Sequence, residues 1–308
     1  MTSHTAKLTP EQAEALRGIL AKRDFESAEV PHAVFSYKRP KLAITWYKSG
    51  KLLIQGKGTQ EFVEFTLEPE VLGQAAFADA LDAQPEQLEP RLGVDESGKG
   101  DFFGPLVVAG VYVNEPVARA LDGLGVKDSK AIASDKKIAA LAKGIRDMPG
   151  CVYSVVPIGN ASYNRLHQKM RNVNKILAWG HARVIENLLG QRDRMNPAPL
   201  RAISDQFARS KATIQSALME EGRQLKLVQM HKAESDIAVA AASILARDLF
   251  VQRLSALGRE FDLELPKGAS SKVDAAGAAF LKKHGMYKLG QAAKLHFRTT
   301  QKIQAGLL

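Results

Sequence analysis

Beyond residue 90, short apolar runs alternate with longer segments whose apolar residues recur at helical spacing. The strand-like runs lie at residues 92–94, 106–113, 151–157, 200–204 and 225–229, and the helical patterns lie at 134–146, 174–190, 210–221 and 236–254. Strands that alternate with helices build a layered domain, because each helix buries its apolar face against the sheet. We therefore expect an α/β layered domain here.

The start of the chain predicts a smaller domain of a different kind. Residues 8–22 predict a helix, because Thr9 can cap its N-terminus and Pro10 fits its first turn. Strand-like segments follow at 34–37, 42–47 and 51–55. A Lys-Ser-Gly sequence between the last two is typical of a hairpin turn. One helix followed by a small sheet indicates an α+β fold.

Residues 73–90 separate the two parts. This segment starts with a helical pattern and ends in a polar stretch between Pro85 and Pro90, which is typical of a linker. Length also favours two domains, since 308 residues exceed the roughly 150 of a common domain. We predict an N-terminal domain at 1–72, a linker at 73–90 and a larger domain at 91–308.

Positive charge is concentrated in the larger domain. The chain has 43 Lys and Arg against 33 Asp and Glu, and residues 91–308 hold 33 of the former and 20 of the latter. A basic surface of this kind attracts a polyanion, nucleic acid above all. A generally basic enzyme without such a partner would show the same net charge, so charge alone leaves both interpretations open.

A second basic segment lies in the N-terminal domain, which is otherwise acidic. Residues 31–60 contain six Lys or Arg and no Asp or Glu. Lys38, Lys48 and Lys51 lie in or beside the strand-like segments, and they are candidates for contacts with phosphate groups of a nucleic acid. The alternative is an edge hairpin that its lysines protect from aggregation.

Several features argue against a membrane or secreted protein. The longest apolar runs, Leu106–Val113 and Ile237–Ala246, are far shorter than the ~18–20 residues of a membrane-spanning helix. The N-terminus shows no apolar signal core. The single cysteine, Cys151, can build neither a disulfide framework nor a cysteine zinc site. We expect a soluble protein of the cytoplasm.

The segment Gly93–Pro105 holds the most informative motif of the chain. Its first half nearly satisfies the G-x-x-x-x-G-K pattern of a phosphate-binding loop, but the pattern fails at Gly100, where Ser or Thr should bind magnesium. Asp95 and Glu96 would also repel a phosphate held in such a loop. This argues against nucleotide binding of that kind.

The same two acids make sense as metal ligands. Two adjacent carboxylates at the end of a short apolar strand need a compensating cation, and hard divalent ions such as Mg²⁺ prefer oxygen ligands. The following Gly98-Lys99-Gly100 offers one cation and a backbone that a nucleic-acid phosphate can approach closely. An Asp-Glu pair that merely starts a turn is the alternative.

Further acidic residues follow other predicted elements. Asp205 ends the strand-like run at 200–204, and Glu234 and Asp236 open the helical pattern at 236–254. Each has an ordinary structural explanation as well, because acidic residues cap and stabilise helix N-termini. Spacing alone does not decide between Glu234 and Asp236 as a metal ligand.

Together, these segments in this order resemble the type 2 ribonuclease H family, in its HIII form. The blocks that carry the resemblance are Asp95–Asp101, with the Gly-Lys-Gly sequence of the HIII form, Lys169–His181, Asp205–Phe207 and His231–Arg247. The basic segment near the N-terminus is similar to the substrate-binding domain of that form, which resembles TATA-binding protein. The resemblance implies a ribonuclease H-like layered fold for the larger domain, with a central mixed sheet flanked by helices.

Carried over to this chain, the four active-site acids of the family fall on Asp95, Glu96, Asp205 and Glu234. The HIII form has Glu in the fourth place, which makes Asp236 the less favoured ligand. The implied activity is endonucleolytic hydrolysis of the RNA strand of an RNA–DNA hybrid, with 5′-phosphate and 3′-hydroxyl products. Two Mg²⁺ or Mn²⁺ ions, bound by the four acids, would serve a monomeric enzyme.

The resemblance also implies where the hybrid binds. Discrimination of RNA from DNA requires the 2′-hydroxyl, and the loop after Glu96 is the candidate for reading it, namely Ser97, Gly98, Lys99 and Gly100. A polar and basic cluster ahead of the 174–190 helix is the candidate for phosphate contacts, namely Lys169, Arg171, Asn172 and Asn174. The alternative for this cluster is a solvated helix N-terminus.

Two rival functions remain distinguishable by experiment. A non-catalytic nucleic-acid-binding protein would bind hybrid without metal and without need of Asp95. A two-metal nuclease of another kind would cut duplex DNA that holds no ribonucleotide. His231, His284 and His296 do not have the spacing of a zinc site, so we expect them to make structural or polar contacts.

Overall fold

A computed structural model describes residues 3–72, 88–127, 129, 132–205, 217, 220–230 and 233–306. The chain forms two compact units, Met1–Ala83 and Gln84–Leu308, and we describe each by itself. Most of the predicted linker and of the predicted helix at 210–221 lies outside the described residues, as do Gln206, Phe207 and His231.

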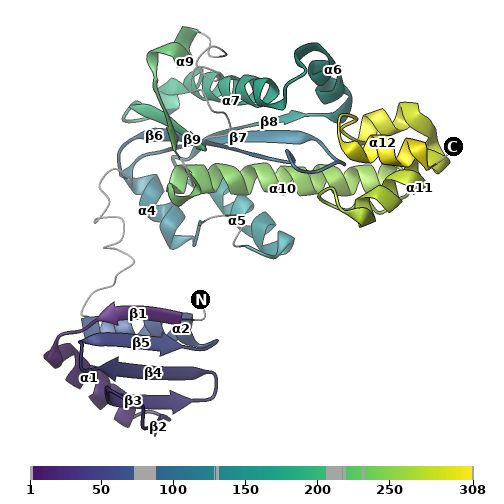
Figure 1. The fold of residues 1–308 in the computed structure, drawn as a ribbon. Coiled ribbons are helices and arrows are strands. Elements are labelled where there is room, and N and C mark those ends of the chain that lie inside the picture. The colour runs from purple at the N-terminus through teal and green to yellow at the C-terminus, as the bar shows by residue number, and fades with distance from the viewer. Residues whose placement is uncertain are drawn as a thin grey trace. The chain divides into compact units, whose positions relative to one another are not determined.

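The N-terminal unit contains a five-stranded antiparallel sheet in the order β1-β5-β4-β3-β2 (Figure 1). The strands are β1 (Ser3–Lys7), β2 (Glu26–Ser27), β3 (Ala33–Arg39), β4 (Leu42–Tyr47) and β5 (Lys51–Gln55). The helical elements are α1 (Pro10–Ala21), α2 (Thr59–Phe62) and the π-helix η1 (Val63–Leu72).

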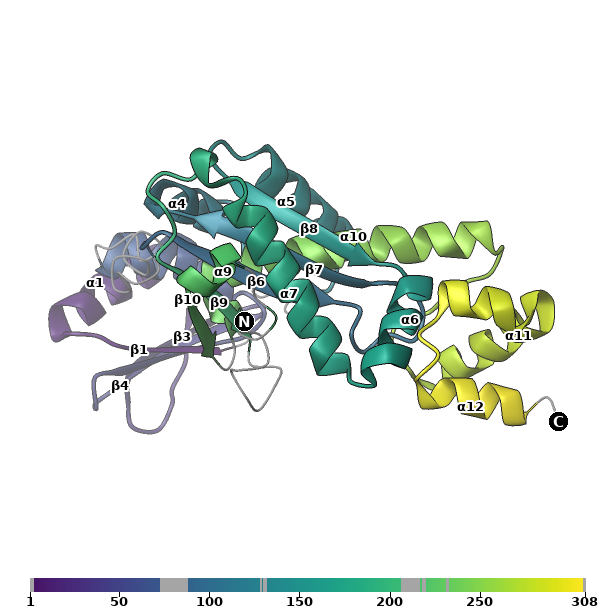
Figure 2. The ribbon, with the colours of Figure 1, turned by 90° about the horizontal axis from the view of Figure 1, so that it is seen from above.

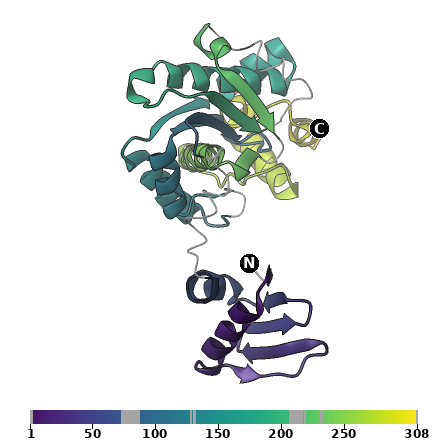
Figure 3. The same ribbon diagram turned by 90° about the vertical axis from the view of Figure 1, so that its left-hand side faces the viewer.

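One face of this sheet is buried under α1, α2 and η1 (Figure 3). Leu16 and Leu20 of α1 pack with Ile44 and Ile54 of the sheet, and all four are fully buried. Thr9 accepts a hydrogen bond from the backbone of Gln12 and caps α1 as the sequence predicts. The unit therefore has its own core, which confirms the predicted small α+β domain.

The larger unit is built on a mixed sheet in the order β10-β9-β6-β7-β8 (Figures 1 and 2). Its strands are β6 (Arg91–Ser97), β7 (Leu106–Val113), β8 (Val152–Ile158), β9 (Arg201–Asp205) and β10 (Lys226–Met230). β6, β7 and β8 pair antiparallel, whereas β6, β9 and β10 pair parallel. This confirms the predicted central mixed sheet.

Helices cover both faces of the sheet. One face packs against α4 (Glu115–Gly123), α5 (Asp135–Asp147) and the long α10 (Ile237–Glu260), and the other face packs against α7 (Val173–Leu189) (Figure 3). Shorter elements are α6 (Asn160–Met170), η4 (Arg192–Arg194), α9 (Glu220–Gln224) and η5 (Ala233–Ser235). The chain continues through α11 (Ser271–Ala292) and α12 (Arg298–Ala305).

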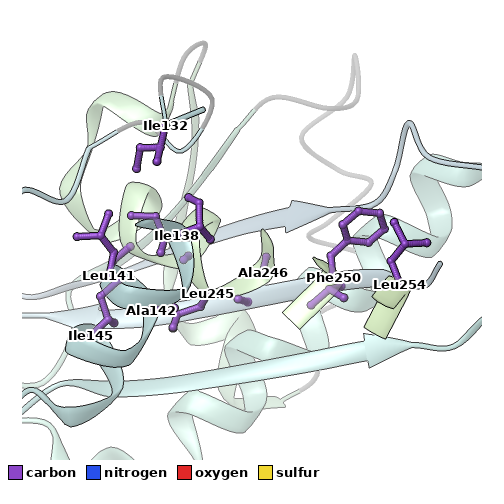
Figure 4. Packing of buried hydrophobic residues seen from close by; sticks show 14 of the residues in the cluster. Ile132, Ile138, Leu141, Ala142, Ile145, Leu245, Ala246, Phe250 and Leu254 are labelled. Atoms are coloured by element: carbon purple, nitrogen blue, oxygen red, sulfur yellow. The ribbon is translucent and has the colours of Figure 1, made fainter. Parts of the chain in front are cut away.

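The core on the α10 side explains why this helix lies so close to the sheet. Figure 4 shows α5 side chains, among them Leu141 and Ile145, directed toward Leu245 and Ala246 of α10. A Cβ atom on Gly93 of β6 would lie only 2.2 Å from the carbonyl carbon of Ala238. Small residues on both surfaces therefore allow close contact between α10 and β6.

None of the helices in the described ranges is long and apolar enough to cross a membrane.

Candidate active site

The end of β6 presents two carboxylates toward opposite faces of the sheet. Side chains alternate along a strand, and Gly93 faces α10 while Val94 lies in the cluster that packs on α7. The alternation therefore places Asp95 on the α10 side and Glu96 on the α7 side.

Asp205 lies beside Asp95 on the neighbouring strand. β9 runs parallel to β6, and Val94 pairs with Ser204 at the end of the shared register. The next position on each strand is an aspartate, and residues in register on parallel strands share a face. Asp95 and Asp205 are thus neighbours at the carboxyl ends of two parallel strands.

Glu234 reaches the same side of the sheet from a third segment. It lies in η5, which comes directly before α10. Its neighbour Ala233 is fully buried in one cluster with Ile203 of β9 and Val239 of α10. This packing fixes Glu234 beside β9, on the side of the sheet that Asp95 and Asp205 face.

Glu96 is held by a histidine and a lysine. His181 of α7 is fully buried, and its Nε2 lies 2.9 Å from Oε2 of Glu96. Nζ of Lys99 lies 3.6 Å from Oε1 of the same carboxylate. Burial alone would raise the pKa of Glu96, but the hydrogen bond from His181 and the charges of His181 and Lys99 bring the pKa below its usual value. Glu96 is therefore ionised at neutral pH.

Asp236 has a structural role that explains why an acidic residue stands at this position. It is the N-cap of α10, and its Oδ1 accepts hydrogen bonds from the backbone of Ala238 and Val239. Its Oδ2 accepts a hydrogen bond of 2.7 Å from Nε of Arg91, which is fully buried at the start of β6. Both oxygens of Asp236 are therefore occupied by contacts that anchor α10.

The donor chemistry of the four acids suits a hard divalent cation, since all are carboxylates. Within the described ranges, however, no three His, Cys, Asp or Glu side chains stand together closely enough to hold a metal ion. The backbone brings Asp95, Asp205 and Glu234 to one side of the sheet, and Glu96 lies at the same strand end on the other side. The described side chains do not form a closed ligand set.

The loop after β6 combines one buried and one open glycine. Gly98 is buried at a positive φ of 90°, and a Cβ there would lie 2.2 Å from the carbonyl oxygen of Pro105. Its lack of a side chain is therefore explained by packing. Lys99 and Gly100 are exposed, and no atom lies within 4 Å of a Cβ built on Gly100. Ser97 is the half-buried last residue of β6.

The second candidate cluster lies where α6 meets α7. Lys169 is in the last turn of α6, and Arg171 ends the helix in the left-handed conformation, with φ of 49°. Asn172 caps α7 by accepting a hydrogen bond from the backbone of Asn174. Lys169, Arg171 and Asn172 are exposed and Asn174 is half-buried. The N-cap of Asn172 gives it a structural role besides any contact with substrate.

The three lysines predicted in the N-terminal unit are all exposed. Lys38 of β3 and Lys51 of β5 alternate with core residues, which places both on the sheet face opposite the helices. Lys48 lies in the turn between β4 and β5.

Sequence reasoning missed the contacts of His181 and Arg91. Their partners are 85 and 145 residues distant in the sequence, so no local pattern reveals them. The expectation that the remaining histidines make structural or polar contacts is confirmed for His284 and His296. Nε2 of His284 lies 2.7 Å from the carbonyl oxygen of Phe261, and the ring of His296 stacks on that of His167 with centroids 4.3 Å apart.

Comparisons with known proteins identify the family of the larger unit. A family model described as "Ribonuclease HII" matches residues 92–300. A second model, described as "Domain of unknown function (DUF3378)", matches residues 4–73. The chain thus belongs to the ribonuclease HII family, which is the type 2 class of ribonuclease H.

Similar proteins indicate which type within this family the chain represents. Ribonuclease HIII of Chlamydia pneumoniae is 44% identical over 303 residues, which cover 97% of each chain. Ribonuclease HIII of Protochlamydia amoebophila is 43% identical over 94% of this chain and 93% of that protein. Within its family the chain is therefore of the HIII type, a ribonuclease H with endonuclease activity.

Solved structures of similar proteins match nearly the whole chain. The match to the structure of Bst-RNase HIII in complex with Mn²⁺ covers 99% of this chain and 98% of that one. The two are 32% identical in sequence, with a TM-score of 0.66. Aquifex aeolicus RNase H3 covers 95% of this chain, with 25% identity and a TM-score of 0.53. The fold match confirms the fold class predicted for both units.

Proposed function

We propose that the protein hydrolyses the RNA strand of RNA–DNA hybrids in a reaction that depends on divalent metal ions, and that it leaves 5′-phosphate and 3′-hydroxyl ends. The observation that carries this proposal is the register of β6 and β9, because it aligns Asp95 with Asp205 on the side of the sheet where Glu234 lies. This alignment supports the proposal, because metal-dependent hydrolysis needs several carboxylates close together.

Asp95, Glu96, Asp205 and Glu234 would hold the metal, which is Mg²⁺ or Mn²⁺ with two ions per site. Mn²⁺ is named in the complex of the related Bst-RNase HIII. Two divalent cations at such a site supply an activated water and charge stabilisation for the leaving oxygen. Of the four, Glu96 is held in place by His181 and Lys99.

The chain's own residues orient the hybrid around these acids. Exposed Lys99 and Gly100 lie four and five residues after Asp95, where a cation and an open backbone suit the sugar-phosphate strand. Ser97 and the backbone of Gly98 complete this loop. Lys169, Arg171, Asn172 and Asn174 would contact phosphates at the junction of α6 and α7. Lys38, Lys48 and Lys51 would bind the duplex from the N-terminal domain.

The boundaries of the domains are part of the same proposal. Residues 1–72 form the substrate-binding domain, 73–90 link it to the rest, and 91–308 form the catalytic domain, which acts as a monomer in the cytoplasm. The separate core of the N-terminal unit supports this division.

The test uses three end-labelled duplexes, namely an RNA–DNA hybrid, DNA with one embedded ribonucleotide, and plain DNA. Each is incubated with Mg²⁺, with Mn²⁺ or with EDTA. We expect metal-dependent cleavage of the RNA strand of the hybrid, and intact plain DNA. Binding without cleavage under every condition would favour a non-catalytic protein, and cleavage of plain DNA would favour a different nuclease.

Asp95→Asn is the variant that ties this activity to the site. It should abolish cleavage and leave hybrid binding nearly intact, because it removes one ligand charge and keeps the shape. Asp193→Asn, at an exposed position of η4, is the matched control and should cleave as the wild type does. Turnover retained by the Asp95→Asn variant would remove Asp95 from the site.

A further inference from the structure

Lys294 is a lysine with no exposed surface, in the segment between α11 and α12. Its Nζ donates hydrogen bonds of 2.8 Å to the carbonyl oxygen of Asp101 and of 2.6 Å to that of Gly104. Removing an ammonium group from water is costly unless hydrogen bonds replace the water. A lysine kept at such a position therefore needs a reason beyond packing.

The two acceptors belong to the loop that carries Lys99 and Gly100. The backbone of the Lys294 segment pairs with this loop as well, since Lys294 N–H donates to the Phe102 carbonyl at 2.8 Å and Gly104 N–H donates to the Ala292 carbonyl at 3.0 Å. The loop contains three glycines, and Gly98 and Gly104 have positive φ. A segment so rich in glycine has little stiffness of its own. Its hydrogen bonds to the Lys294 segment make it rigid.

The same segment binds α6. Nδ2 of Asn164 donates to the carbonyl of Ala293 at 2.9 Å, and Oδ1 of Asn164 accepts from Leu295 N–H at 3.0 Å. Asn160, at the start of α6, donates to the carbonyl of Gly104 at 2.7 Å. The carbonyl oxygen of Gly104 thus accepts hydrogen bonds from both Lys294 and Asn160. Through these bonds the loop and α6 form one rigid assembly.

The assembly joins two segments that we assign to substrate binding. Lys99 and Gly100 lie on the loop, and Lys169 and Arg171 lie at the far end of α6. We propose that Lys294 is a positioning residue, which fixes the loop against α6 so that both segments meet the hybrid in one geometry. This inference rests on the proposed function and concerns how its substrate is held.

The charge state of Lys294 is consistent with this role. Burial lowers the pKa of Lys294 to about 7, against a raising effect of the Asp101 charge. A neutral amine still carries two N–H donors, enough for the two carbonyls. The contacts to Asp101 and Gly104 therefore persist on both sides of neutral pH.

The test compares Lys294→Met, which keeps the length of the side chain and removes its donors, with Lys294→Gln, which keeps a donor. Lys143→Met, at an exposed position of α5, is the control. Steady-state cleavage of the hybrid gives KM and kcat. Fluorescence anisotropy in an Asp95→Asn background gives the Kd for the hybrid, and Mn²⁺ titration of each variant gives the metal affinity.

We expect Lys294→Met to raise KM and Kd for the hybrid by about tenfold, the scale of one lost hydrogen bond to a charged group. Metal affinity should stay unchanged, kcat should fall less than the affinity for hybrid, and Lys294→Gln should recover part of the loss. A folded Lys294→Met variant with unchanged KM and Kd would overturn the proposal. So would equal losses in metal affinity and hybrid affinity, because they would indicate general disorder.

Asn160→Ala keeps the test decisive if Lys294→Met does not fold. It removes only the second donor to Gly104 and should raise KM in the same direction by a smaller factor. An unchanged KM in this variant would then count against the proposal. Failure of the proposed function is separate and visible, because the wild type itself would then not cleave the hybrid.

Discussion

Nε2 of His181 lies 2.9 Å from Oε2 of Glu96, and this contact joins the centre of α7 to the end of β6. His181 is fully buried, and the Glu96 side chain is only 11% exposed. The pair is thus largely shielded from water. It makes α7 part of the proposed active site, although no residue of this helix is among the metal-binding candidates.

His181→Leu should destabilise the protein by about 1–3 kcal/mol at neutral pH, because it leaves the buried Glu96 carboxylate short of a hydrogen bond. His181→Gln keeps a donor at a similar distance and should cost less. Urea denaturation of both variants at pH 7 measures the difference. Equal stability of the Leu and Gln variants would show that the hydrogen bond contributes nothing beyond side-chain volume.

Glu234 and Asp236 should separate into a catalytic and a structural acid. Glu234→Gln should abolish cleavage, because it removes one carboxylate charge from the proposed metal site. Asp236→Ala should lower the free energy of unfolding by about 3–5 kcal/mol, since it leaves Arg91 buried without its ion-pair partner. Asp236→Asn keeps the cap and should retain cleavage. Loss of cleavage in a stable Asp236→Asn variant would contradict this division.

Gly98 and Gly100 should respond differently to the same substitution. Gly98→Ala places a Cβ against the Pro105 carbonyl and the Phe250 ring, at a φ that favours glycine, so we expect a loss of about 1–3 kcal/mol in stability. Gly100→Ala meets open space and should leave stability unchanged within about 0.5 kcal/mol, while it weakens hybrid binding. Thermal unfolding and anisotropy measure the two effects. A stable Gly98→Ala variant would mean that the loop repacks.

The sequence was sufficient for much of the architecture. Alternating strands and helices predicted the layered α/β domain, and an apolar run followed by two carboxylates marked the end of β6. The roles of Asp236 and Gly98 could not be predicted, because each depends on a distant partner. Arg91 decides the first, and Phe250 and Pro105 decide the second. Secondary-structure propensity depends on residues close together in the sequence. The contacts of Asp236 with Arg91 and of Gly98 with Phe250 form only when α10 packs on the sheet.

Lys294 should make stability depend on pH in a defined direction. Its pKa is about 7 in the folded protein and about 10.4 in an unfolded chain. Between these values the unfolded chain binds a proton that the folded protein does not, so the free energy of unfolding rises with pH. Relative to Lys294→Met, the wild type should gain up to about 1.4 kcal/mol per pH unit above pH 7. Urea titrations of both proteins from about pH 6 to pH 9 would show this, and parallel curves would place the pKa outside that range.

Removal of the N-terminal unit should weaken binding more than chemistry. The larger unit has its own core and holds all four acids, so a chain that starts at residue 84 should fold and cleave. Its KM for the hybrid should rise, because the lysines on the sheet face of the N-terminal unit are lost, and its kcat should change less.

Charge reversal in the full chain tests the same face without truncation. Lys38→Glu with Lys51→Glu should raise KM and make the loss of binding with salt less steep, since two phosphate contacts are lost and fewer counterions are released. Lys22→Glu, at the exposed end of α1, changes charge away from the sheet face and serves as the control. An equal rise in KM for both variants would mean that net charge, and not this face, governs how the N-terminal unit attracts the hybrid.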